Sequence, residues 1–197
     1  MKEFLFIFLL VFGQNSLADT CAVNKNVKDY FLSIPSQMLV IFDDEKGPLV
    51  SKQAREAAID TLDVKNDFMV LQGDTLISKY EIALFRSAEK KPVVLVTADG
   101  VSVQNVYAFS CFGDKWHYVS GSIFPKETLE VIADLYLSAG IMINGKYLNE
   151  KDLAMVSHTL VRYKLPRMGE SIQAYASHPD ILNWKEHVLY DFKPKIR

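Results

Sequence analysis

The chain has 197 residues, of which 49% are hydrophobic and 23% charged, a balance typical of a globular protein and not of a disordered one. This length predicts one domain with a substantial core. The formal net charge is −2, so the chain lacks the basic excess that neutralises phosphates, which argues against a nucleic-acid partner.

Residues 1–18 have the pattern of a secretory signal peptide. A lysine precedes an apolar run of nine residues, and Ser16 and Ala18 occupy the two positions that a signal peptidase reads. We expect cleavage between Ala18 and Asp19, which leaves a single domain over 19–197 in the periplasm or outside the cell. A membrane-spanning helix needs about 20 apolar residues, so no transmembrane anchor is expected.

The two cysteines, Cys21 and Cys111, are expected to form a disulfide, because an exported protein folds in an oxidising compartment. The bridge would close a loop of about 90 residues, to which the chain-entropy model assigns about 4–5 kcal/mol. We expect it to hold the N-terminal arm against an aromatic face of the sheet described below.

Two helical patterns come first along the mature chain. Residues 24–35 place apolar side chains on one helical face and end at Pro35. Residues 51–60 are rich in alanine and begin at Ser51, a favourable N-cap, so they are also expected to be helical. The apolar face of the first helix comprises Val27, Tyr30, Phe31 and Ile34.

From residue 66 the pattern changes to short strands separated by turn signals. Gly113-Asp114 fits a two-residue hairpin turn, which pairs Phe112 with Lys115 and Cys111 with Trp116. The expected strands are 68–73, 80–87, 92–98, 105–112 and 115–121. One face of the hairpin would carry Tyr107, Phe109, Cys111, Trp116 and Tyr118.

The second half of the chain starts with two further helical patterns and then returns to strands. Strands on both sides of a helical insert, without regular βαβ alternation, predict the α+β class. We expect an antiparallel meander of about six to eight strands, three or four packed helices and one disulfide. The expected helices are 125–140 and 149–158, and the expected strands are 160–166, 171–176 and 187–192.

Four motifs follow one another along the mature chain. They are D-V-K-N-D-F at 63–68, E-I-A-L-F at 81–85, a G-D-K-W…F-P stretch at 113–125 and Y-K-L-P-R-M-G-E-S-I at 163–172. Their order resembles a group of uncharacterised exported bacterial proteins with D-x-K-N-G-Y, E-x-A-L-F, D-G-K-W…L-P and Y-x-L-P-R-x-G-T-T-I segments. In this chain Asp67 replaces the glycine of the first motif. The resemblance implies a shared architecture, and it implies no activity or cofactor.

No pattern of catalytic or metal-binding residues is complete. The four histidines lack HxxxH and HExxH spacing and the cysteines are expected to be bridged, so no metal or cofactor is expected. The S-x-x-K match at 87–90 lies at a strand end, where a serine and a lysine do not share a helical turn. Carboxylates near the first strand leave a paired-carboxylate hydrolase open. They are Asp60, Asp63, Asp67, Asp74 and Glu81.

Arg167 and Arg162 are the first candidate ligand-binding residues. Arg167 lies in a strand connection bracketed by Pro166 and Gly169, where proline presets one backbone angle and glycine accepts positive φ. With Lys164 and Lys185, the two arginines would form a small basic patch able to bind an anionic glycan or a partner protein. The alternative is that these charges lie in solvent at the sheet edge and only discourage edge-to-edge pairing with another chain.

Trp116 and Tyr118 are the second pair of candidates, because aromatic side chains on one strand face can line a pocket. A striped face packs into a core more often. Taken together, the sequence predicts a non-catalytic exported protein that binds an envelope component or a partner protein. A cell-wall or glycan hydrolase with paired carboxylates and a secreted enzyme inhibitor remain the alternatives.

Overall fold

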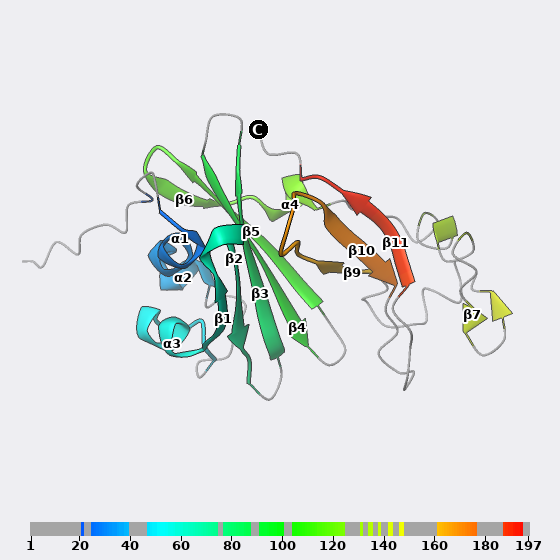
Figure 1. Cartoon of the computed structure of the whole chain (residues 1–197), viewed down its shortest axis with the longest axis horizontal. Helices are drawn as coiled ribbons and strands as arrows, with labels where there is room; N and C mark the ends of the chain where they lie inside the picture. Colours follow the sequence, from blue (N-terminus) through cyan, green and yellow to red (C-terminus); the bar gives the residue numbers. More distant parts are fainter. Residues whose placement is uncertain are drawn as a thin grey trace, which may run out of the picture.

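The computed structural model describes residue 21 and residues 25–39, 47–74, 77–87, 91–100, 104–124, 161–176 and 187–194, with shorter pieces between 131 and 147. These parts form three layers, in which short helices and a three-stranded sheet lie on opposite sides of a six-stranded sheet (Figure 1). The protein is mostly β.

The helical layer consists of α1 (Val27–Ser33), α2 (Ser36–Leu39) and α3 (Lys52–Ala57). The side chain of Asn26 accepts a hydrogen bond from the backbone of the first turn of α1, and Ser51 does the same for α3. Helix α3 therefore begins where the sequence predicts, and α1 lies within the predicted range 24–35 but begins three residues later.

Strand β1 (Ile59–Asp63) corrects the prediction of a helix over 51–60. The helix ends early because the carbonyl of Ala58 accepts a hydrogen bond from the amide of Gln72 at 2.8 Å, which starts the pairing of β1 with β2. A 3₁₀ turn, η2 (Val64–Asn66), follows β1 and leads into β2.

The six-stranded sheet is an antiparallel meander in the order β1-β2-β3-β4-β5-β6. Its predicted hairpin is confirmed, since Phe112 pairs with Lys115 and Cys111 pairs with Trp116. The strands after β1 are β2 (Phe68–Gln72), β3 (Ile77–Arg86), β4 (Pro92–Gly100), β5 (Gln104–Phe112) and β6 (Lys115–Tyr118).

The strand expected over 115–121 is too long. Strand β6 stops at Tyr118, and a short helix, α4 (Ser120–Ile123), follows. The Ser120 hydroxyl accepts a hydrogen bond from the Ala108 amide at 2.5 Å, so a side chain replaces the next rung of the ladder.

One core fills the space between the helices and the meander, and the Cys21–Cys111 disulfide is part of it. The predicted bridge is thus confirmed, with a sequence separation of 90 residues. Buried Arg55 of α3 braces the same layer, since its guanidinium donates to the carbonyls of Leu32 and Ile34. The N-terminal arm is tied to the aromatic face of β5 and β6, as expected.

The six strands of the meander fall within the predicted six to eight, and the last strands form a separate sheet that the sequence did not predict. Strands β9 (Val161–Lys164), β10 (Ile172–Ala176) and β11 (His187–Phe192) are antiparallel in the order β11-β10-β9. A second core lies between this sheet and the meander. Strands β7 (Met142–Ile143) and β8 (Lys146–Tyr147) pair only with each other.

Several sequence predictions fall on residues outside the described parts of the chain. These are the signal peptide over 1–18, the helix over 149–158 and most of the helix over 125–140, of which the four described residues are helical. None of the helices in the described parts has the length and apolar character needed to span a bilayer.

Candidate functional site

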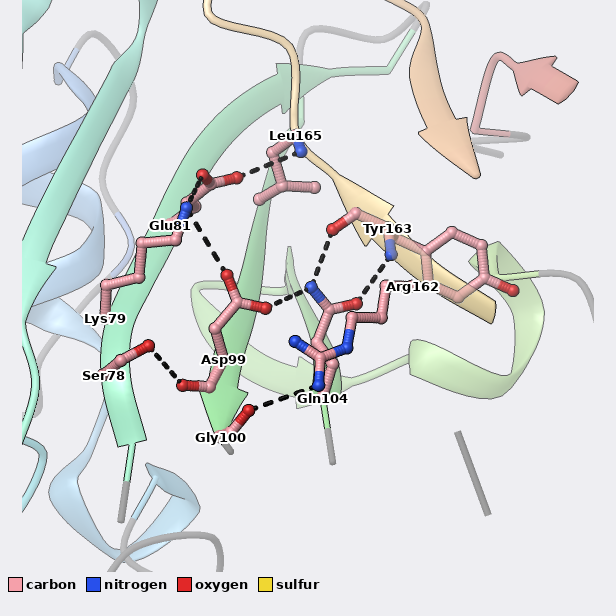
Figure 2. A network of polar contacts seen from close by, with 9 residues as sticks. All are labelled: Ser78, Lys79, Glu81, Asp99, Gly100, Gln104, Arg162, Tyr163 and Leu165. Carbon is pink, nitrogen blue, oxygen red and sulfur yellow. Dashed lines mark hydrogen bonds and ion pairs between the residues drawn. The ribbon is translucent and has the colours of Figure 1, made fainter. Parts of the chain in front are cut away.

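A network of polar side chains lies between the meander and the three-stranded sheet, at one end of β3, β4 and β5 (Figure 2). Lys79 donates to Glu81 at 2.7 Å and lies 3.5 Å from the carboxylate of Asp99. Glu81 and Asp99 are buried, with 7% and 8% of their surfaces exposed. The cluster therefore contains two buried carboxylates and one half-exposed cation.

Gln104 extends this network to β9. Its side-chain nitrogen donates to Asp99 at 2.6 Å and to the carbonyl of Tyr163 at 2.8 Å, while its oxygen accepts from the Tyr163 amide at 2.7 Å. Glu81 accepts a further hydrogen bond from the amide of Leu165 at 3.3 Å. Side chains of the meander thus bind the backbone of β9 in the way a neighbouring strand would.

The charge of Lys79 is favoured by this arrangement. Burial alone would lower the pKa of Lys79, but the hydrogen bond to Glu81 and the attraction of Glu81 and Asp99 outweigh burial and raise it. Both carboxylates are thereby engaged by Lys79, Gln104 and β9. A hydrolase needs two carboxyl groups that face a substrate, whereas these two face their own chain.

A hollow of about 400 Å³ lies beside the turn that joins β9 to β10, and we call it the β9–β10 hollow. Gly169 has a φ of +88° in this turn, as expected for its glycine. A second hollow of about 360 Å³ adjoins it and shares Gly169 and Glu170. The lining of the β9–β10 hollow is formed by 164–171, Gln173 and Asp191.

Arg167 lies on the wall of this hollow and also reaches β1. Its Nε donates to Asp63 Oδ2 at 3.1 Å, and the rest of the arginine side chain is exposed. The pKa of Asp63 is lowered below its ordinary value, mainly by the hydrogen bond from the Asn66 side chain and next by the hydrogen bond from Arg167. Arg167 therefore uses its Nε–H group in the ion pair with Asp63, and its other guanidinium N–H groups are open to solvent.

The other predicted site residues lie elsewhere. Arg162 donates to the carbonyl of Gly100 at 3.3 Å, at the far end of β9 from Arg167. Trp116 is buried on the helical side of the meander and donates to Ser33 at 3.3 Å, whereas Tyr118 is half exposed. The four candidates do not converge, and Lys185 falls outside the described residues.

Sequence reasoning missed Lys79, Asp99 and Gln104, and it saw Glu81 only as a scattered acid. The alternation of inward and outward side chains along the strands does indicate this cluster. Glu81 is in phase with Ala83 and Phe85, which face the second core, and Gln104 is in phase with Ala108 on the same face. Polar residues at core-facing positions indicate a buried polar network.

Ser87, the serine of the S-x-x-K match, lies directly after β3, and the other residues of the match, 88–90, fall outside the described residues. The amide of Ser87 donates to the carbonyl of Lys91 at 2.9 Å, and the Ser87 hydroxyl accepts from the Lys91 amide at 3.1 Å. Ser87 thus closes the loop between β3 and β4. Within the described residues, no group of three or more His, Cys, Asp or Glu side chains is arranged to hold a metal ion.

No protein-family model, curated protein or solved structure matches the chain. The function is therefore argued from the geometry of the two regions described above.

Asp63→Asn is expected to lower the melting temperature at pH 7 and to lower it less near pH 2.5. A carboxyl whose pKa is lowered on folding stabilises the fold above its ordinary pKa of about 3.9, and this contribution is lost as the pH falls through the lowered value. Thermal unfolding at both pH values measures it. Asp60→Asn, on the exposed side of the same strand, is the control. An equal loss at both pH values for Asp63→Asn would contradict the expectation.

Proposed function

We propose that the chain is an exported, non-catalytic protein that binds an envelope component or a partner protein through the β9–β10 hollow. The leader-like pattern of 1–18 and the disulfide support the export part of this proposal. The hollow carries the binding part, because it is an open concavity of a size common for ligand sites, lined by charged and apolar groups from one turn and three strands.

The contacts of the two buried carboxylates favour a binding function over a hydrolase function. Glu81 and Asp99 are engaged by Lys79, Gln104 and the β9 backbone, and they lie between two sheets. The charged groups of the β9–β10 hollow, by contrast, lie at the surface. A ligand can reach them without opening the fold.

We also propose that the motifs shared with the exported bacterial group encode this architecture. Asp63 of the first motif binds Arg167 of the last, and Glu81 of the second binds the amide of Leu165. Asp67, which stands where the first motif has glycine, has a φ of +52°, a conformation that glycine adopts without strain. Residues of different motifs thus bind one another across the two sheets.

The binding proposal predicts that Arg167→Ala weakens retention of the protein on cell envelopes without unfolding it. The probes are insoluble bacterial cell-wall sacculi and detergent-solubilised envelope proteins immobilised on resin, and the readout is the fraction of protein retained. We expect wild type to be retained on one of them and Arg167→Ala to be retained several-fold less. Lys28→Ala, which removes a partly exposed ion pair with Glu56 on the helical side, is the matched control.

Two outcomes would overturn the proposal. One is the absence of retention on both probes. The other is turnover of a glycan or cell-wall substrate that Glu81→Gln abolishes while the fold is kept, since the chain would then be a hydrolase. Inhibition of a purified target enzyme by the wild type, lost in Arg167→Ala, would identify that enzyme as the partner protein.

A further inference from the structure

The floor of the β9–β10 hollow is one rung of the three-stranded sheet. Gln173 of β10 pairs with Lys164 of β9 on one side and with Asp191 of β11 on the other. Their neighbours Tyr163 and Ile172 face the core, so alternation places Lys164, Gln173 and Asp191 on the opposite, exposed face. The rung therefore presents a cation, an amide and an anion in a row.

The charged groups on the wall of the hollow each have an ion-pair partner, whereas the charged groups on the floor have none among the described residues. Arg167 binds Asp63, and Glu170 binds Lys193 at 3.1 Å. In the described part of the chain, the side chains of Lys164 and Asp191 have no ion-pair partner. The floor thus offers a ligand one cation and one anion, beside the exposed N–H groups of Arg167 on the wall.

The spacing of these two charges sets the length of the ligand. Neighbouring strands lie about 4.8 Å apart, so the backbones at Lys164 and Asp191 are separated by about 10 Å. An extended chain spans about 3.3–3.6 Å per residue, so about three residues bridge this separation. The amide of Gln173 lies between the two charges and can both donate to and accept from a peptide group.

We propose that the β9–β10 hollow binds a short zwitterionic peptide of about three residues, with its carboxylate at Lys164 and its ammonium group at Asp191. This inference rests on the proposed binding function and names its ligand class. Pro166 and Met168 supply the apolar wall for a ligand side chain. A simple anion such as phosphate gains from Lys164 but is repelled by Asp191, and a neutral sugar uses neither charge.

Trialanine, N-acetyl-trialanine and trialanine amide are the probes, because the two blocked peptides each lack one terminal charge. Binding is measured by NMR titration of the full mature protein at low ionic strength. We expect trialanine to bind about two- to fivefold more tightly than either blocked form, the range of a solvent-exposed ion pair. Raising the ionic strength to 0.15 M should reduce this preference.

Two variants assign the ends of the peptide. Lys164→Gln should abolish the preference for a free carboxylate and keep the preference for a free ammonium group, and Asp191→Asn should do the opposite. Lys52→Gln, an exposed lysine of α3 on the helical side, should change neither. Both floor residues are exposed, so the variants are expected to fold, and their NMR spectra check this directly.

The inference is overturned if trialanine does not bind at 10 mM, if the three peptides bind equally, or if inorganic phosphate binds as tightly as trialanine. If envelope retention still depends on Arg167 in any of these cases, the binding function stands and only the ligand class is wrong. If trialanine binds as expected while neither envelope probe retains the protein, the envelope partner is wrong and the peptide site stands.

Discussion

A Cys21→Ala/Cys111→Ala variant is expected to lose about 2–5 kcal/mol of stability against unfolding. The bridge joins residues 90 positions apart, and for a loop of that length the chain-entropy model gives about 4–5 kcal/mol. Both sulfurs are buried in the core beneath α1, so the bridge also fixes how the helical layer lies on the meander.

Urea unfolding of oxidised wild type, reduced wild type and the double variant measures this effect. Reduction should shift the unfolding midpoint of wild type toward that of the double variant, whose own midpoint should not respond to reductant. Limited proteolysis should cut first in the helical layer before β1, because Trp116, Tyr30 and Ser33 then hold that layer without a covalent tie. Coinciding midpoints for oxidised wild type and the double variant would show that the bridge adds no stability.

Gln104→Met is expected to destabilise the protein by about 3–5 kcal/mol, although methionine nearly matches glutamine in volume. The substitution removes three hydrogen bonds and leaves the amide and the carbonyl of Tyr163 and one oxygen of Asp99 without the partner they have in the wild type. Each buried polar group that loses its partner costs about 1–3 kcal/mol.

The loss should be concentrated between the two sheets. Hydrogen exchange at the amides of Tyr163 and Leu165 should accelerate more than exchange within β3 and β4. Gln72→Met is the matched control, since it makes the same substitution at an exposed strand end. Equal exchange rates at Tyr163 in wild type and Gln104→Met would mean that Gln104 does not hold β9 in place.

The parts of the fold that sequence could predict depend on neighbouring residues. The hairpin register follows from Gly113-Asp114 and from alternation on both sides, and it carries Cys111 onto the face that Cys21 reaches. The first helix follows from a short periodic run of apolar residues that ends before Pro35. In these segments the information is local, so a single sequence contains it.

Other parts depend on partners far along the chain. Strand β1 is short and follows an alanine-rich helix, and it becomes a strand because β2 supplies its hydrogen bonds. Arg167 could be placed on a turn, but its partner Asp63 lies 104 residues away. The polar network joins Gln104 to Tyr163 across 59 residues, and alternation alone cannot reveal which backbone a buried glutamine will meet.

The way in which Gln104 and Glu81 contact β9 also protects the protein against aggregation. An outer strand normally exposes unpaired amides and carbonyls, which can template pairing with another chain. At Tyr163 and Leu165 those groups are occupied by fixed side chains of the meander. A variant that loses Gln104 would thus leave the amide and carbonyl of Tyr163 open to pairing with another chain. Its amyloid-like association should rise even under conditions in which most molecules remain folded.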